Sequence, residues 1–403
     1  MEFPEYIQSS IDPVEIHREL THSFLYYRNL NTFLKQRFVE RTAYFIAQKK
    51  FVARKDLVLT DSIRIIVSAC SIQVTLGLES FLLDNFEYVV IYPDIYESPM
   101  THQMHRGETN LNGFICLSWK HILEGIENPD DNYNLGLHEW THALRFNSIN
   151  YDETDYFFDG YINKWVACAM PEFVNLKNGR TSIFRRYGAT NIHEFLSVCT
   201  EHFFESPDEF KLKAPELFDQ MCILFNQQPA KMDSARIDIR NSLLKVNSVA
   251  VEEPYPVMEL EASFFRTLIH MGTRVLYSGL AILLLLIEIN WTSILISVGI
   301  VLWVIMEMNN KYFTIKFYNN YLYVQSGFMS LFARQLSVNY SSLIKMEIYD
   351  GNFERGFGTV FQFDYYDGNR FLKRVAYCTA IKVPFEDIEK FMHQKKVVAL
   401  FPN

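Results

Sequence analysis

The first part of the chain carries apolar residues at spacings of three, four and seven positions, the pattern of helices with one buried face. Two short apolar runs, Tyr88–Tyr92 and 113–119, instead have the length of buried strands. Beyond residue 240 the pattern dissolves into Ser, Val, Glu and Pro. These features predict a mainly helical domain over 1–240 and a linker over 241–265. The predicted helices cover residues 15–50, 59–83, 135–146, 192–204 and 215–228.

Two strongly apolar runs follow, over 275–287 and 291–306, with Glu288 and Asn290 between them. A carboxylate near the middle of a bilayer is costly, so a turn at these polar residues is more favourable than one long spanning helix. The sequence therefore predicts a transmembrane helical hairpin over 266–310. The competing interpretation is a hairpin buried in the core of a soluble protein.

Basic residues flank the predicted hairpin, because Arg266 and Arg274 precede it and Lys311 and Lys316 follow it. By the positive-inside tendency, the parts on either side both face the cytoplasm. The N-terminal residues lack a basic start followed by an apolar run, so no signal peptide is expected. We therefore expect a multi-pass protein of the inner (cytoplasmic) membrane, with membrane lipid around the hairpin.

From 311 to 403 the apolar period changes to two, which predicts strands. The pairs Asn319-Asn320 and Asp367-Gly368 suit the turns of two hairpins. A proline then opens a closing amphipathic helix. Several strands followed by one C-terminal helix resemble the bacterial PH-like domain, which implies a small β-barrel.

Composition and charge narrow the class of protein. Hydrophobic residues make up 49% and charged residues 21% of the chain, which excludes a disordered protein. The chain carries 38 Lys and Arg against 47 Asp and Glu, a net charge of −9. A nucleic-acid-binding protein usually has a basic surplus, so no nucleic-acid partner is expected. The six cysteines are scattered without a CxxC pair, so no disulfide framework is predicted.

The candidate chemistry lies in an HExxH motif at residues 138–142. In a helix, residues four apart project from one face, so His138 and His142 bring two imidazole nitrogens to one metal ion. Glu139 is rotated aside, close to the metal and available to a bound water as general base. The motif predicts a zinc-dependent peptidase site. The competing interpretation is a surface helix that happens to carry two histidines.

A catalytic zinc usually takes three protein ligands and keeps one open position. The predicted helix over 192–204 and the residue after it offer Glu194, Glu201, His202 and Glu205. Glu194 and Glu201 are seven apart, hence on one face, and the residues between them are mostly apolar. The competing interpretation of Glu194 is a salt bridge, or an acceptor for Nδ1–H of a ligand histidine. His202 by itself is expected to be a packed histidine.

Motifs on both sides of HExxH carry a family resemblance. Over about 15–232 the chain resembles the Mlc titration factor A family of zinc peptidases, which has HExxH and a downstream FAVxSExFF-type helix. The matching segments are IRIIVSACSIQVTLGL at 63–78, VVIYPDIY at 89–96, GFICLSW at 113–119, HEWTHAL at 138–144 and EFLSVCTEHFFESPDEF at 194–210.

The resemblance implies that His138, His142 and Glu201 hold zinc and that Glu139 is the catalytic base. Tyr187 falls where the family has a tyrosine, which implies a donor to the oxyanion. The predicted hairpin and PH-like tail are absent from the soluble members of the family.

The predicted fold is α+β: a mainly helical zincin-type metallopeptidase domain, a transmembrane hairpin, and a PH-like domain over 311–403. The predicted function is a membrane-anchored, cytoplasm-facing zinc metallopeptidase acting on a peptide or protein substrate. In it, Glu139 deprotonates a zinc-activated water that attacks the peptide carbonyl. The strand at 113–119 is expected to present an edge to an extended substrate.

Two other functions compete with this prediction. The first is a membrane-tethered protein that sequesters a regulatory protein, with a structural or vestigial zinc site. Glu139 discriminates the two, because no structural zinc site requires it. The second is an intramembrane protease, which is disfavoured because the motif lies about 130 residues before the hairpin, far from membrane depth.

Overall fold

The computed structural model of the chain describes residues 11–150, 156–229, 235–244, 256–261, 272–285, 287, 290–311, 313–326, 334–350, 359–368, 371–378, 385–395 and 397–400. The chain divides into two compact units, with the boundary between Leu243 and Leu244. The domain limits expected from the sequence remain predictions, and much of the linker over 241–265 lies outside the described residues.

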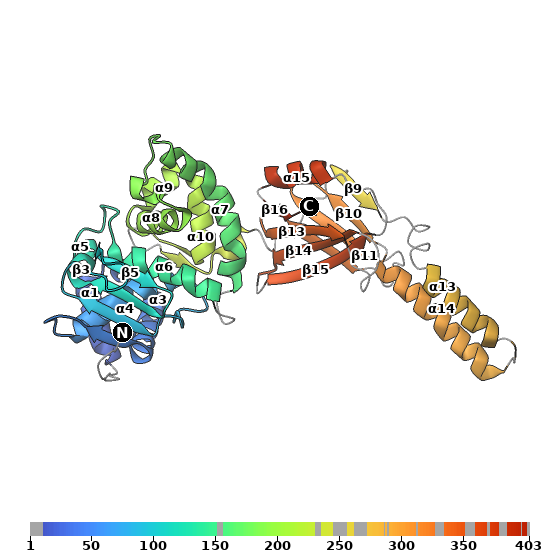
Figure 1. The fold of residues 1–403 in the computed structure, drawn as a ribbon, viewed down its shortest axis with the longest axis horizontal. Helices are drawn as coiled ribbons and strands as arrows, with labels where there is room; N and C mark the ends of the chain where they lie inside the picture. The colour runs from blue at the N-terminus through green and yellow to red at the C-terminus, as the bar shows by residue number, and fades with distance from the viewer. Residues whose placement is uncertain are drawn as a thin grey trace. The chain divides into compact units, whose positions relative to one another are not determined.

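The first unit contains a four-stranded sheet (Figure 1). The order of its strands is β1-β2-β6-β5. Its strands are β1 (Lys50–Ala53), β2 (Tyr88–Tyr92), β5 (Gly107–Asn110) and β6 (Phe114–Ser118). The strands β1, β2 and β6 run parallel, and β5 pairs antiparallel with β6. Because β6 has a neighbour on each side, the expectation that 113–119 presents an edge to substrate is wrong. The edge strand on this side of the sheet is β5.

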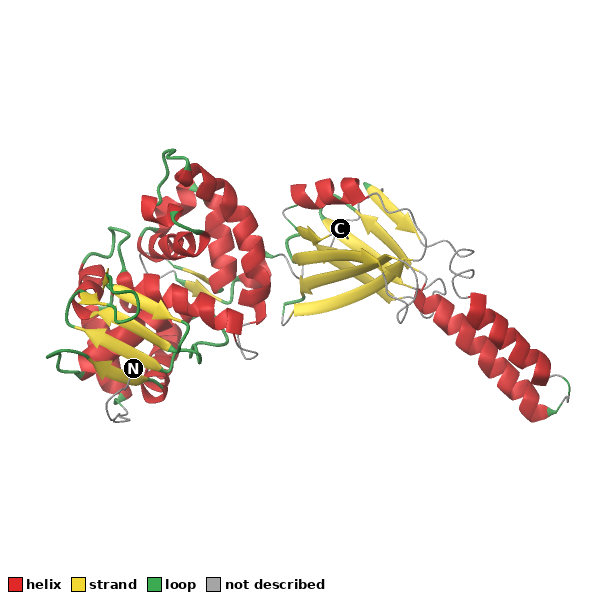
Figure 2. Ribbon diagram, in the orientation of Figure 1, coloured by secondary structure: helices red, strands yellow, loops and turns green. Residues whose placement is uncertain are grey.

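Helices lie against this sheet and form a second lobe beside it (Figure 2). Helix α6 lies between them, since it packs against α4 and the strands β5 and β6 as well as against α8. The helices of the unit are α1 (Pro13–Ser23), α2 (Leu25–Arg28), α3 (Thr32–Gln48), α4 (Asp61–Thr75), α5 (Trp119–Glu127), α6 (Leu135–Asn150), α7 (Tyr156–Lys177), the 3-10 helix η1 (Arg186–Ala189), α8 (Ile192–Glu205), α9 (Pro207–Lys213), α10 (Pro215–Phe225) and α11 (Arg240–Leu243). Two short ladders complete the unit, β3 (Tyr96–Glu97) with β4 (Met104–His105) and β7 (Gln227–Gln228) with β8 (Arg236–Ile237).

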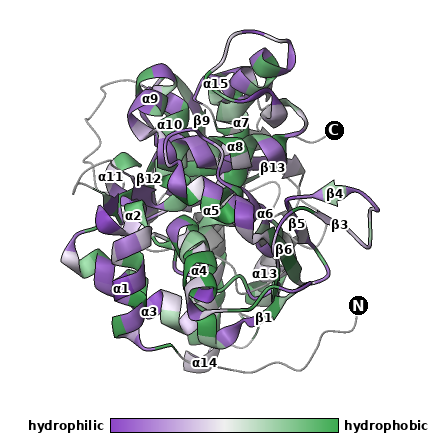
Figure 3. Ribbon diagram, turned by 90° about the vertical axis from the view of Figure 1, so that its left-hand side faces the viewer, coloured by the Kyte–Doolittle hydropathy of each residue, from purple (hydrophilic) through white to green (hydrophobic). Residues whose placement is uncertain are grey.

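Local capping explains where the first helices begin. The single helix expected over 15–50 is divided into α1, α2 and α3. Asp12 caps α1 by accepting from the backbone N–H of Val14, and Asn31 caps α3 by accepting from Leu34 N–H. Hydrophilic and hydrophobic residues alternate along α1 and α3 in Figure 3, as one buried face requires.

Two buried helices of this unit differ in how well the sequence predicts them. Helix α4 is buried over nearly its whole length and corresponds to the apolar pattern expected at 59–83. Helix α7 has no counterpart among the expected helices. Pro171 lies inside α7, and a proline usually ends a helical pattern.

The second unit contains two four-stranded sheets, in the orders β12-β11-β10-β9 and β15-β14-β13-β16. Apolar side chains from both sheets and from α15 form one core. The elements are β9 (Met258–Glu261), α13 (Gly272–Leu285), α14 (Trp291–Lys311), β10 (Phe313–Phe317), β11 (Tyr321–Ser326), β12 (Arg334–Asn339), β13 (Leu343–Asp350), β14 (Thr359–Tyr366), β15 (Phe371–Cys378), α15 (Phe385–Gln394) and β16 (Val398–Leu400).

The expectation of a small closed β-barrel in this unit is wrong. Closure would need hydrogen-bonded pairing between the outer strands of the two sheets. In the described residues β9 pairs with β10, β12 with β11, β15 with β14 and β16 with β13, and the two sheets stay separate. The strands themselves agree with the period-two pattern, but the PH-like assignment is not supported.

The transmembrane hairpin expected over 266–310 is also wrong. Within the described residues, none of the helices combines the length and the apolar composition that crossing a bilayer requires. Helix α13 has 14 residues, about 21 Å at ~1.5 Å per residue, against a hydrocarbon core of about 30 Å. The apolar part of α14 stops at Met306, before Glu307. A multi-pass inner-membrane protein is therefore not supported, and Arg266 and Glu288 lie outside the described residues.

Candidate metal centre

Helix α6 carries the HExxH motif and is held from its first turn. The side chain of Asn134 accepts from the backbone N–H of Leu137 at 3.0 Å, which caps the helix. Gly136 allows α6 to approach α4 closely, since a Cβ at this position would lie 2.6 Å from Sγ of Cys70. The motif therefore sits on a buried, rigidly placed helix, and the alternative of a surface helix is wrong.

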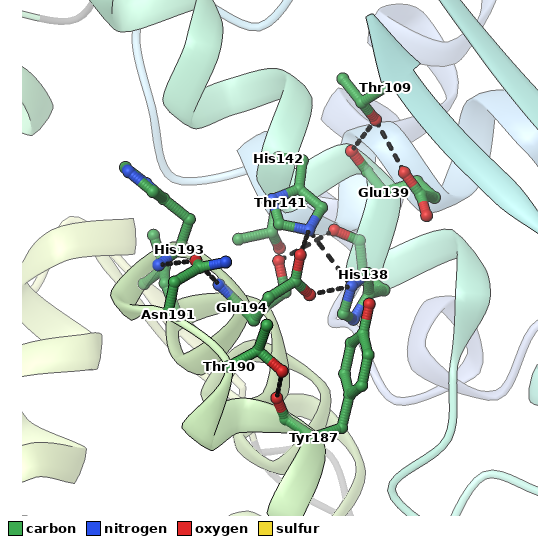
Figure 4. A network of polar contacts seen from close by, with 12 residues as sticks. Thr109, His138, Glu139, Thr141, His142, Tyr187, Thr190, Asn191, His193 and Glu194 are labelled. Carbon is green, nitrogen blue, oxygen red and sulfur yellow. Dashed lines mark hydrogen bonds and ion pairs between the residues drawn. The ribbon is translucent and has the colours of Figure 1, made fainter. Parts of the chain in front are cut away.

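Three side chains converge at one point between α6 and α8 (Figure 4). Nε2 of His138 and Nε2 of His142 are 3.2 Å apart. Glu194 of α8 lies against both, with Oε2 at 3.0 Å from His138 Nε2 and Oε1 at 3.4 Å from His142 Nε2. All three ligand atoms lie within 4.8 Å of one another. Two nitrogens on a tetrahedral zinc would be separated by roughly 3.3 Å, so this donor set fits such an ion.

Helix α8 places Glu194 in its first turn. Asn191 caps the helix, because its side chain accepts from the backbone N–H groups of His193 and Glu194 at 2.9 and 3.0 Å. The cap fixes where α8 begins and therefore which residues face α6. The sequence motif alone does not show this contact, since the two helices are separated by α7.

Glu201 does not join this group of three. Its Oε1 accepts from Nδ1 of His138 at 2.8 Å, on the other side of the imidazole ring, and also pairs with Arg185. Its Oε2 accepts from the backbone N–H of Asn134 at 2.8 Å. The geometry thus gives Glu194 the position expected of the third ligand, and Glu201 the position of the acceptor that orients a ligand histidine.

Glu139 lies beside the group, against the edge strand β5. Thr109 donates to Oε2 of Glu139 at 2.8 Å and to its backbone carbonyl at 3.0 Å. A Cβ on Gly107 would lie 2.6 Å from Oε1 of Glu139, so only glycine leaves room for this carboxylate at its present position. Neither Gly107 nor Thr109 belongs to a motif, and no local sequence signal predicts their contact with Glu139.

Tyr187 belongs to η1 and faces the same group of side chains (Figure 4). Its ring centroid lies 5.8 Å from that of His138, while the residue stays 53% exposed. Burial, followed by the charges of Glu194 and Glu139, raises the pKa of Tyr187 to about 12. The phenol therefore keeps its proton at neutral pH and can donate a hydrogen bond.

The neighbouring carboxylates favour the charged form of His138. Burial opposes the charged form of His138, but hydrogen bonds from this ring to Glu194 and Glu201 outweigh it and raise its pKa to about 10. Burial would raise the pKa of Glu194, but its contacts with His138 and His142 hold that pKa well below the ordinary value. A metal binds neutral imidazole, so metal binding at this group releases protons.

His138 of this group lies on the wall of a cavity of about 620 Å³, together with Glu139 and Tyr187. Arg185, which the motifs do not single out, lies on the same wall with its guanidinium 3.9 Å from the ring centroid of Tyr133. The cavity is large enough for several residues of a peptide, and it brings the carboxylate of Glu139 and the phenol of Tyr187 close to His138, one of the three residues that could hold a metal ion.

Fold and site together define a protein of the metallopeptidase type, with two motif histidines on one buried helix and a carboxylate from a second. The chain belongs to the family described as glucose-regulated metallo-peptidase M90, whose model matches residues 5–226.

Similar proteins cover the same part of the chain. An uncharacterised protein of Synechocystis sp. is 26% identical over 221 residues, which are 48% of this chain and 76% of that protein. Mlc titration factor A of Salmonella agona and of Klebsiella pneumoniae are each 26% identical over 223 residues, half of this chain and 83% and 82% of the relatives. The expected resemblance to the Mlc titration factor A family is confirmed. The expected fusion to a membrane hairpin and a PH-like domain is not supported.

Proposed function

We propose that the chain is a zinc-dependent peptidase that hydrolyses peptide bonds, with zinc held by His138, His142 and Glu194 in place of the expected Glu201. The observation that supports this most is the convergence of two Nε2 atoms and one carboxylate within 4.8 Å. A HExxH helix, an acid beside it and an adjoining cavity complete the requirements of a hydrolytic metal site.

Each residue has a distinct task in this proposal. Zinc at this group would supply a Lewis acid that polarises the substrate carbonyl and acidifies a water molecule. Glu139 accepts a proton from the attacking water and returns it to the leaving nitrogen. Thr109 and Gly107 hold Glu139 in place, one by a hydrogen bond and the other by leaving room for it.

Substrate binding and oxyanion stabilisation come from the cavity walls. Tyr187 keeps its proton and donates to the oxygen that becomes negative when the carbonyl is attacked. The edge strand β5 runs directly past Glu139, so an extended peptide that pairs with β5 would bring its backbone to the reacting groups.

The test compares wild type with Glu139→Gln, which keeps the size of the side chain and removes its ability to carry a proton. Both purified proteins are loaded with zinc, and cleavage of an unstructured peptide library is followed by mass spectrometry. We expect equal zinc content and a fall in cleavage of ~10²–10⁴-fold. A chelator should abolish wild-type cleavage, and added zinc should restore it. Equal cleavage by the two proteins would remove Glu139 from the mechanism.

A second candidate function is binding of a regulatory protein, which the printed name of the relatives, Mlc titration factor A, favours. Binding of this kind does not need proton transfer by Glu139. If neither wild type nor Glu139→Gln cleaves any peptide while both retain purified Mlc in a pull-down, the second candidate is supported and the peptidase proposal fails.

A further inference from the structure

The first unit contains a second cavity, of about 280 Å³, apart from the metal centre. Aromatic side chains form part of its walls, and Tyr26 and Phe204 meet edge to face with ring centroids 5.6 Å apart. Its described lining includes two carboxylic acids, Asp130 and Glu205, and no lysine, arginine or histidine. Aromatic faces and acidic groups both attract organic cations, so the lining of this cavity favours a cationic ligand over a neutral or anionic one.

Glu205 is the unusual member of this lining. The residue is 6% exposed, and Oε1 accepts from the side-chain nitrogen of Asn134 at 2.9 Å. Its Oε2 is buried and accepts from no side chain among the described residues, while the backbone N–H of Asn132 lies near the carboxyl group and acts to lower its pKa. Burial raises the pKa of Glu205 to about 8, and the nearby acids Glu201 and Asp131 add to the shift. An acid buried in this way gains most from a cation that enters the cavity.

We propose that this cavity binds a small organic cation, namely a primary ammonium group on a short alkyl chain. The ammonium pairs with the carboxylate of Glu205, while the alkyl chain lies against Phe24, Tyr26 and Phe204. The space corresponds to roughly nine water molecules at ~30 Å³ each, which is enough for an alkylamine of about six non-hydrogen atoms. The proposal is independent of the peptidase proposal, because its readout is binding.

The contacts of Asn134 determine which substitution of Glu205 tests this site. Its side chain donates to Glu205, its backbone N–H donates to Glu201, and it lines both cavities. In Glu205→Gln the amide oxygen can still accept from Asn134, so the wall between the cavities is retained while the charge is lost. Asp130→Asn is the matched control, because Asp130 lines the same cavity but is exposed.

The test is calorimetric titration of the zinc-loaded full chain with pentylammonium at pH 8.5, above the pKa of Glu205. Pentan-1-ol and pentanoate are the neutral and anionic probes of the same length. We expect saturable binding of pentylammonium that is at least tenfold weaker in Glu205→Gln. In Asp130→Asn it should weaken by no more than about threefold, because the charge of the exposed Asp130 is screened by solvent. Pentan-1-ol and pentanoate should each bind at least tenfold more weakly than pentylammonium.

Two sources can present the same ammonium chemistry, a free alkylamine and a lysine side chain. Blocked lysine, with an acetylated amino group and an amidated carboxyl group, is the probe for the second source. Binding of pentylammonium alone assigns a free amine, and tighter binding of blocked lysine assigns a lysine of a peptide. The proposal is overturned if pentan-1-ol binds as well as the amine. It is also overturned if Glu205→Gln binds the amine as tightly as wild type does, because this result would indicate binding at the metal centre. The absence of binding by both ammonium probes would overturn it as well.

Discussion

Nδ1 of His138 lies 2.8 Å from Oε1 of Glu201, an acid whose other oxygen is already held by the backbone of Asn134. An ionised carboxylate can only accept, so the proton of this contact sits on Nδ1 of the ring. In the neutral ring the lone pair is then on Nε2, the nitrogen that faces Glu194. Such a contact fixes the orientation of a ligand histidine and raises its basicity.

Removing Glu194 and altering Glu201 should therefore affect metal binding to different degrees. Glu194→Ala deletes one of the three proposed ligands, and we expect it to lose zinc during dialysis, as His142→Ala should. Glu201→Gln leaves the three ligands in place and should weaken zinc binding by about 10–100-fold, as changes at orienting carboxylates do. Metal analysis by mass spectrometry and competition with a chelator measure both. Full zinc in Glu194→Ala together with loss in Glu201→Gln would restore Glu201 as the ligand.

Gly107→Ala should reduce peptidase activity without unfolding the protein. The added Cβ would meet only the flexible end of Glu139, so that carboxylate must move while the strand stays in place. We expect a loss of roughly 10²-fold in kcat/KM, the usual effect of a misplaced catalytic group, with zinc content unchanged. The control is Gly279→Ala, where the new Cβ has no heavy atom within 4 Å. Wild-type turnover by Gly107→Ala would show that β5 does not position Glu139.

Tyr187→Phe tests the oxyanion donor. The change removes one hydroxyl group from a residue whose pKa is raised to about 12, and removal of one such donor typically costs about 10²-fold in kcat. KM and zinc content should change little. Tyr133→Phe is the matched control, because Tyr133 lines the same cavity. Its contact with Arg185 is made by the aromatic ring, which this variant keeps. An equal effect of both substitutions would assign the loss to the cavity as a whole.

Local spacing accounts for the parts of the site that the sequence predicts. His138 and His142 share a face because a helix repeats every 3.6 residues, and this holds wherever the helix lies. Glu194 and Glu201 share a face for the same reason, so spacing cannot decide which of them meets Nε2 of His138. The answer depends on how α8 packs against α6, which involves contacts between residues about sixty positions apart.

The same distinction applies to the fold. The period-two pattern predicts the strands of the second unit, while the pairing of their edges is a long-range property, and two separate sheets form in place of a barrel. The apolar runs at 275–287 and 291–306 predict helices but not their ends. The contact of Gly107 with Glu139 has no local signal, since a glycine in a strand indicates only that something approaches closely.

The stability of the protein should depend on pH through Glu205. Burial raises the pKa of Glu205 from the ordinary 4.5 to about 8 in the folded state. Between these two values the folded protein keeps a proton that the unfolded chain has lost, so the free energy of unfolding falls as pH rises from about 4.5 to about 8. The contribution is present below pH 4.5 and lost above pH 8. The side chain of the Glu205→Gln variant cannot titrate. Its free energy of unfolding, relative to that of wild type, should therefore rise between pH 5 and pH 8, by on the order of a few kcal/mol.

Urea unfolding of both proteins at the two pH values measures this, with Asp130→Asn expected to follow wild type. A difference that stays constant between pH 5 and pH 8 would show that Glu205 is already ionised in the folded protein.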